Sequence, residues 1–253
     1  MKSAALLLLA LLPAVALAGT YRETRYLESP AGGVHALIVR CGAGELTLKG
    51  IDGTATIEVF AEIESEGKDE EEFKLMTDKL MQLELRREYD RALLFSNLAI
   101  PPLTGKDARI HLNIQVPVNM NVRIVDSSGS MIISNLIGNL SIDDDSGNIT
   151  LANITGRVQI ADGSGDIEVE DIQGRLEIVD GSGDIAIQHV TGDVNIQDAS
   201  GGIEINDIGG SVTVSDGSGS IDIYRVKKNV FIRESGSGKL DIDGVQGNVT
   251  IRN

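Results

Sequence analysis

In the C-terminal half of the chain, apolar and polar side chains alternate in short segments that recur every nine residues. Each segment has two apolar residues separated by one polar residue, as in Ile167–Val169 and Leu176–Ile178. A period of two is typical of a β-strand that buries one face, and the abundance of β-branched residues favours strands over helices. The apolar pairs are Ile149/Leu151, Val158/Ile160, Ile167/Val169, Leu176/Ile178, Ile185/Ile187, Val194/Ile196, Ile203/Ile205, Val212/Val214, Ile221/Ile223, Val230/Ile232, Leu240/Ile242 and Val249/Ile251.

Glycines group these segments into repeats of 18 residues. Ser-Gly pairs recur at Gly129, Gly147, Gly165, Gly183, Gly201 and Gly219, and a second glycine series falls halfway at Gly138, Gly156, Gly174, Gly192 and Gly210. One residue is inserted near Gly236, and the first series resumes at Gly238. A third apolar series is predicted to fill one corner of each coil, and it comprises Leu136, Ile154, Ile172, Val190, Ile208, Val226 and Val245.

Two architectures fit short repeated strands. An antiparallel meander would alternate strand direction, so equivalent residues would not stack one coil apart. Nearly identical coils instead favour parallel, in-register stacking, which buries a continuous core that no single coil could bury. We therefore predict an all-β fold, a parallel β-solenoid of seven 18-residue coils over residues 126–253.

The region before the repeat has two parts. Residues 1–18 have a basic start, an apolar run and Ala16–Ala18, which predicts a secretory signal peptide and an exported protein in the periplasm or at the cell surface. Residues 19–125 predict an irregular β-rich region that either caps the solenoid or begins its stack, with strands at about 82–88, 92–97, 108–117 and 121–125. Apolar residues from Phe73 to Met81 predict one short helix with its Phe and Met side chains toward the core.

Composition narrows the classes of partner. The net charge is −16, which disfavours nucleic acid and anionic lipid, and no later segment is long or apolar enough to span a membrane. Tryptophan is absent, so few platforms exist for stacking bases or sugars. The lone Cys41 cannot form an intramolecular disulfide, and we expect it to be buried.

An acidic residue precedes each Ser-Gly turn. In-register stacking would place these carboxylates in a column of like charge, which something must offset. Either each Asp accepts N–H groups of its own turn, with the adjacent serines bonded along their column, or Ca²⁺ bridges neighbouring coils. The irregular residues after the glycine, including Gly202 and Lys239, favour turn chemistry over a metal column. The acidic residues are Asp126, Asp144, Asp162, Asp180, Asp198, Asp216 and Glu234, and the serines are Ser128, Ser146, Ser164, Ser182, Ser200, Ser218 and Ser237.

Basic residues gather in the last two coils. They either protect an open final strand from association or form a docking end for an acidic partner or a second copy of the chain. They are Arg225, Lys227, Lys228, Arg233, Lys239 and Arg252.

The sequence lacks the motifs that are typical of a catalytic site. His35, His111 and His189 fit no metal-ligand spacing, and His189 falls at a corner predicted to be a solvated turn. The Ser-Gly pairs lack the strand–turn–helix context of a nucleophile elbow, and no helix follows Asp162–Asp166 to bind a phosphate. The sequence thus indicates no catalytic, cofactor-binding or metal-ligating residues.

The motif Asp-Gly-Ser-Gly-Asp-Ile-x-Ile at residues 180–187, followed by Gly-x-Val-x-Ile at 192–196, resembles the adhesin-like, β-strand-repeat family of bacterial envelope proteins of unknown function. The resemblance implies a β-helical fold outside the cytoplasm and supplies no functional residues. We therefore expect a non-catalytic, adhesin-like or scaffold protein that acts through its faces and C-terminal end. The alternative is a polysaccharide-processing or cation-dependent β-helix enzyme.

Overall fold

The structure is a computed structural model that describes residues 20–66, 70–98 and 108–252. The expected signal peptide at 1–18 and the loop expected around Pro101, Pro102 and Gly105 lie outside the described residues. The chain divides into two compact units, residues 1–130 and residues 131–253.

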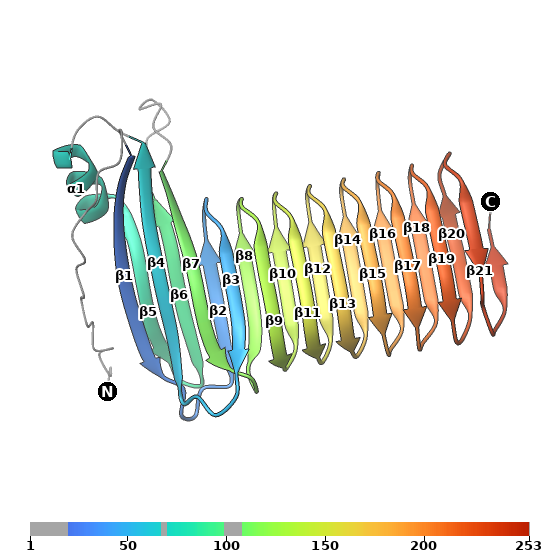
Figure 1. Cartoon of the computed structure of the whole chain (residues 1–253), viewed down its shortest axis with the longest axis horizontal. Helices are drawn as coiled ribbons and strands as arrows, with labels where there is room; N and C mark the ends of the chain where they lie inside the picture. Colours follow the sequence, from blue (N-terminus) through green and yellow to red (C-terminus); the bar gives the residue numbers. More distant parts are fainter. Residues whose placement is uncertain (1–19, 67–69, 99–107, 253) are drawn as a thin grey trace. The chain divides into compact units, whose positions relative to one another are not determined.

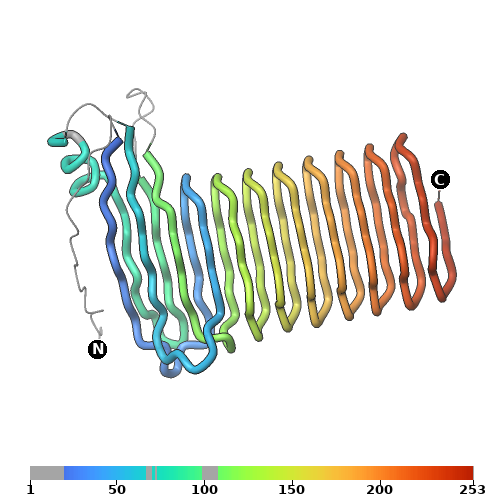
Figure 2. Tube along the Cα trace, in the orientation of Figure 1, coloured from blue at the N-terminus to red at the C-terminus, as the bar shows by residue number. Residues whose placement is uncertain are grey.

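Residues 131–252 form a parallel β-solenoid (Figures 1 and 2). Each coil gives one strand to each of two parallel sheets, with orders β9-β11-β13-β15-β17-β19-β21 and β10-β12-β14-β16-β18-β20-β22. The bounds are β9 Met131–Ile137, β10 Leu140–Asp144, β11 Ile149–Thr155, β12 Val158–Asp162, β13 Ile167–Gln173, β14 Leu176–Asp180, β15 Ile185–Val190, β16 Val194–Asp198, β17 Ile203–Ile208, β18 Val212–Asp216, β19 Ile221–Val226, β20 Val230–Ser235, β21 Leu240–Asp243 and β22 Val249–Ile251.

Equivalent residues of successive coils pair in register. Ile167 pairs with Ile185, and Leu176 pairs with Val194, both across a spacing of 18 residues. The predicted fold class is therefore confirmed, and the antiparallel meander is wrong because these strands run parallel.

The apolar pairs and the corner series lie between the two sheets. They are almost fully buried from Met131 to Ile232, as the alternation predicts. The last coil differs: Val249 and Ile251 are 45% and 48% exposed, although Val230 and Ile232, one coil earlier, are buried. Burial of the inward positions therefore depends on having a coil on both sides.

Glycine is required at the Ser-Gly turn because the backbones stack closely there. Gly183 has a φ of +139°, and a Cβ at this position would overlap the carbonyl oxygen of Gly165 in the preceding coil. The 18-residue glycine spacing is thus a packing requirement of each coil on the last.

The inserted residue produces a β-bulge in β20. Val214 still pairs with Ile232, but Ser215 pairs with Glu234 and Asp216 with Ser235. Arg233 is therefore the extra residue, and it displaces Glu234 by one position.

Residues 20–130 form an irregular β-rich unit with two mixed four-stranded groups, β1-β4-β7-β3 and β8-β2-β6-β5. β3 pairs parallel with β7, and β2 pairs parallel with β8, whereas β4 runs antiparallel to β1 and β7. Solenoid-like pairing is therefore present only in part. The bounds are β1 Thr20–Pro30, β2 Ala36–Cys41, β3 Leu46–Ile51, β4 Thr56–Glu66, α1 Glu70–Lys79, β5 Met81–Glu88, β6 Arg91–Leu98, β7 Ala108–Pro117 and β8 Asn121–Asp126.

The predicted strands and helix of this unit are confirmed with small shifts of boundary. In α1, Phe73 is buried and its ring stacks on Tyr21 at 5.8 Å, whereas Leu75 is 52% exposed. In the part of the chain that the structure describes, no helix is long and apolar enough to cross a membrane.

Candidate functional site

The acidic residues before the Ser-Gly turns stack as predicted. Within residues 131–253 they form what we call the aspartate column, which consists of Asp144, Asp162, Asp180, Asp198 and Asp216. Asp126, in the N-terminal unit, stands before the turn at Gly129 and is also buried. Glu234 does not continue the column, because the bulge places Ser235 opposite Asp216 and leaves Glu234 exposed.

The aspartate column uses the predicted turn chemistry. The N–H groups of Ser146, Ser164, Ser200 and Ser218 each donate to Oδ1 of the aspartate two residues earlier, at 3.0–3.4 Å. The Ser200 hydroxyl donates to the Gly181 carbonyl of the preceding coil at 3.4 Å. The carboxylates thus serve as turn caps.

The aspartate column faces the interior of the coils, which was not predicted. Its side chains are only 0–7% exposed. The signal was present in the sequence, because Val158, Ile160 and Asp162 continue one period-two series and therefore lie on one face of β12.

A second contact that was not predicted lies at the residue after three of the turn glycines, Gly147, Gly165 and Gly183. The side-chain oxygens of Asn148, Asp166 and Asp184 accept the backbone N–H of the equivalent residue in the next coil, at 2.8–3.0 Å. Asn and Asp at this position therefore make the same bond between neighbouring coils.

The corner opposite the Ser-Gly turns holds a row of residues in the left-handed conformation. We call it the corner row, and its φ values lie between 56° and 60°. Asn and Asp tolerate this conformation better than most residues, which suits them to the row, whereas arginine is unusual there. The corner row consists of Asn135, Asn153, Asp171, His189, Asp207 and Arg225.

From Asp171 onward, carboxylates alternate with His189 and Arg225 along the corner row. His189 lies between two carboxylates, with Nδ1 3.5 Å from Asp171 and Nε2 3.5 Å from Asp207. Arg225 donates two hydrogen bonds to Asp207, at 2.6 Å and 2.9 Å. Hydrogen bonding from Arg225 is the main cause that lowers the pKa of Asp207. His189 is exposed, as predicted, but it lies within β15 and not in a turn, and the two carboxylates beside it were not predicted.

An open groove of ≈ 1080 Å³ runs beside the corner row. We call it the corner groove. It is lined by the corner row from Asn153 to Arg225 and by the residues two positions further on, which include Thr155, Gln173, Thr191 and Lys227. Successive coils therefore present two parallel lines of mostly polar residues, the second of which is interrupted by Gly209. Neighbours within a line lie one strand spacing apart, ~4.8 Å.

The basic residues of the last coils do not form one patch. Arg225 is tied to Asp207, and Lys239 forms an ion pair with Asp241 at 3.0 Å. Arg225 and Lys227 border the corner groove, whereas Arg233 and Arg252 line a separate groove of ≈ 400 Å³ beside Phe231. The basic residues therefore divide between two grooves, and whether they protect the final strand or form a docking end stays a prediction.

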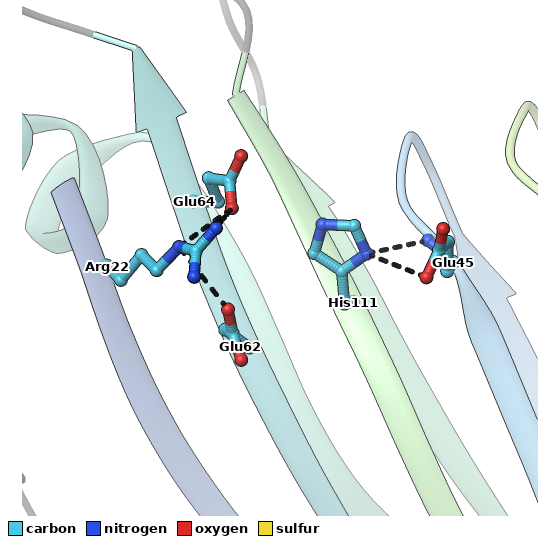
Figure 3. Close-up of polar contacts among 5 residues, drawn as sticks. All are labelled: Arg22, Glu45, Glu62, Glu64 and His111. Carbon is cyan, nitrogen blue, oxygen red and sulfur yellow. Dashed lines mark hydrogen bonds and ion pairs between the residues drawn. The ribbon is translucent and has the colours of Figure 1, made fainter. Parts of the chain in front are cut away.

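The N-terminal unit carries scattered polar contacts on the outer side of its first strand group (Figure 3). The Arg22 guanidinium lies 2.8 Å from Glu64 and 3.6 Å from Glu62. His111 Nδ1 accepts the Glu45 backbone N–H at 3.2 Å and lies 3.8 Å from the Glu45 carboxylate. These contacts tie neighbouring strands together.

His35 and Cys41 are the two remaining candidate residues from the sequence. The His35 carbonyl oxygen accepts from the Asn121 side chain at 3.2 Å. Cys41 is half-buried, with its sulfur 3.8 Å from the Val125 carbonyl oxygen, so it is less buried than expected. Within residues 20–66, 70–98 and 108–252, no group of three or more His, Cys, Asp or Glu side chains has a geometry for a metal ion.

The coil architecture defines the class of protein: a parallel β-solenoid with an irregular β-rich N-terminal unit. The Toastrack DUF4097 family model matches residues 45–252. The chain therefore belongs to the Toastrack DUF4097 family. No curated protein matches the sequence.

Several solved structures are similar to this chain at low identity. A "putative lipid binding protein" from Parabacteroides distasonis ATCC 8503 is 15% identical with a TM-score of 0.49, covering 91% of this chain and 94% of that one. A "putative adhesin" from Parabacteroides merdae ATCC 43184 is 11% identical with a TM-score of 0.47, covering 92% and 96%. A "putative cell adhesion protein" from Clostridium sporogenes ATCC 15579 is 11% identical with a TM-score of 0.33, covering 91% and 100%.

Proposed function

We propose that this protein is an exported, non-catalytic component of the bacterial envelope, an adhesin-like or scaffold module that binds a protein or other envelope partner through the side of its solenoid. The observation that carries the proposal is the corner groove, where charged and polar side chains of five successive coils line one continuous surface. The periplasm or the cell surface is the location expected from the sequence of residues 1–18.

The corner groove suits a polar partner. Asp171 and Asp207 offer carboxylates, Arg225 and Lys227 offer positive charge, and Gln173 and Thr191 offer hydrogen-bonding groups. The stacked backbone holds these groups at fixed intervals, so little conformational entropy is lost when a partner binds. Charges of both signs favour specificity and orientation over raw affinity.

Burial of the aspartate column supports the non-catalytic part of the proposal. Burial is the main cause that raises the pKa of Asp162, Asp180 and Asp198 to about 6, a range suited to acid–base chemistry. The same burial keeps a polysaccharide away from these carboxyls, because they are at most 7% exposed. Turn capping therefore accounts for these residues better than hydrolysis.

Association through the last coil is a separate part of the proposal. Phe231 is 40% exposed beside Arg233 and Arg252, and this groove would suit an acidic partner or the acidic flank of a second copy. Reversing Arg233 and Arg252 to Glu should abolish concentration-dependent dimerisation in sedimentation equilibrium. Unchanged behaviour of the variant, or a monomer at all concentrations, would leave the corner groove as the binding surface.

The test of the corner groove is co-sedimentation with isolated envelope fragments of the source organism. The groove variant carries Asp171→Asn, His189→Asn and Asp207→Asn, so that these coils resemble those of Asn135 and Asn153. This choice keeps residues that tolerate the left-handed conformation.

The matched control removes the same number of carboxylates from the flat outer face of the sheet, with Glu168→Gln and Glu204→Gln. We expect the wild type and the control to sediment with the fragments and the groove variant to stay in solution. Equal sedimentation of all three proteins would contradict the proposed surface. Release of new reducing ends from envelope polysaccharide by the wild type alone would contradict the non-catalytic role.

A further inference from the structure

The aspartate column is more than a set of turn caps, because Asp162, Asp198 and Asp216 each have one buried carboxylate oxygen without a hydrogen-bond partner. Oδ1 of Asp162, Asp198 and Asp216 accepts a serine N–H, but Oδ2 of each is buried with no hydrogen-bond partner. An unsatisfied buried carboxylate oxygen is costly to the folded state.

Stacking in register adds repulsion to this cost. Asp162 pairs with Asp180, Asp180 with Asp198, and Asp198 with Asp216, so successive carboxyls follow one strand spacing of ~4.8 Å. Two like charges this close in a partly dry environment oppose each other's ionisation.

The charged groups that act on the column are themselves acidic. Burial and these neighbours together raise the pKa of the three central carboxyls to about 6 and also raise the pKa of Asp216. The neighbours are Asp144 for Asp162, Asp162 and Asp166 for Asp180, Asp180 and Asp216 for Asp198, and Glu234 for Asp216.

We propose that the aspartate column is a proton-binding site built into the solenoid, and that proton uptake makes the coil stack more stable at mildly acidic pH than at neutral pH. Each proton comes from solvent, cancels one buried negative charge and converts an unpartnered oxygen into a hydrogen-bond donor. The inference is independent of the binding partner, since it concerns the interior of the coils.

The direction follows from linkage. A carboxyl with a native pKa of about 6 and an unfolded pKa of 3.8 binds more protons in the native state than in the unfolded state between these two pH values. Its contribution to stability is therefore absent well above pH 6, grows as the pH falls through 6 and is complete below 3.8. Between pH 7 and pH 5, one such carboxyl lowers the unfolding equilibrium constant about tenfold. Carboxyls with lowered pKa values, such as Glu177 and Asp207, lose their contribution to the stability of the folded state only at a pH more acidic than this range.

The test is urea unfolding of the full chain at pH 7, 6 and 5. The variant Asp198→Asn keeps an oxygen for the Ser200 N–H but removes one titrating group, and Glu168→Gln, on the exposed face, is the control. We expect the unfolding equilibrium constant of the wild type and of the control to be at least about tenfold lower at pH 5 than at pH 7. In Asp198→Asn this decrease should be smaller than in the wild type by a factor of about ten. Stability that is flat or falling toward pH 5, or an unchanged slope in Asp198→Asn, would overturn the proposal.

A second measurement needs no variant. Carboxyl ¹³C titration of the wild type should show at least three aspartates that titrate near pH 6, and ordinary titration of all of them would refute a proton-binding column. A third arm adds Ca²⁺ or a chelator at pH 7. A rise in melting temperature with Ca²⁺ that Asp198→Asn abolishes would assign the column to a cation instead of a proton.

Discussion

The repeat allows one substitution to be compared at equivalent positions with different burial. Ile196 in β16 is fully buried, and Ile251 in β22, which occupies the same place in the final coil, is 48% exposed. Removing a buried isoleucine side chain to Ala loses the transfer energy of about three methylene-sized groups, roughly 2.4 kcal/mol at ~0.8 kcal/mol each. At Ile196 a cavity remains between the neighbouring coils, so the expected cost is about 2–5 kcal/mol.

At Ile251 about half of that surface is already in water and solvent fills the space. The expected cost of Ile251→Ala is therefore about 1 kcal/mol. The assay is urea unfolding followed by circular dichroism, with the two variants and the wild type compared at equal m-values so that the midpoints report stability. Equal destabilisation by Ile196→Ala and Ile251→Ala would refute the argument that burial of a coil requires a neighbour on each side.

Two further substitutions test the turns. Gly183→Ala places a Cβ onto the Gly165 carbonyl oxygen, which should cost over ~2 kcal/mol and lower the melting temperature by more than about 4 °C. Gly32→Ala, with open space around it, should shift the melting temperature little in the same thermal scan. Arg225→Asn loses an ion pair that solvent screens but gains a residue that tolerates the left-handed conformation, so its midpoint of urea unfolding should stay close to that of the wild type. A larger loss would mean that the ion pair with Asp207 stabilises the corner.

Much of the solenoid could be predicted because its signals repeat. Ile167/Val169 and their equivalents define the buried face, and the glycine spacing gives the coil length. A single strand with this pattern would not define the fold, but a dozen such strands at a fixed spacing favour one architecture, a stack of parallel coils.

Features that depend on one residue's backbone or register escaped prediction. Asp162 was assigned to a turn, although it also ends the buried face of β12. Arg225 carries no turn signal, so its left-handed conformation follows only from its place in the stack. The insertion near Gly236 was visible, but its exact site in β20 decides that Glu234 leaves the aspartate column, and sequence spacing alone does not locate a bulge.

The corner groove as the partner-binding surface is tested most directly by site-specific photo-crosslinking. A photoreactive residue is placed at Thr191, which lines the groove, or at Ala186, which is exposed on the outer face of β15, and each protein is irradiated with isolated envelope fragments. The account predicts a covalent adduct from position 191 and none from position 186. An adduct from position 186 alone, or from neither position, would contradict it.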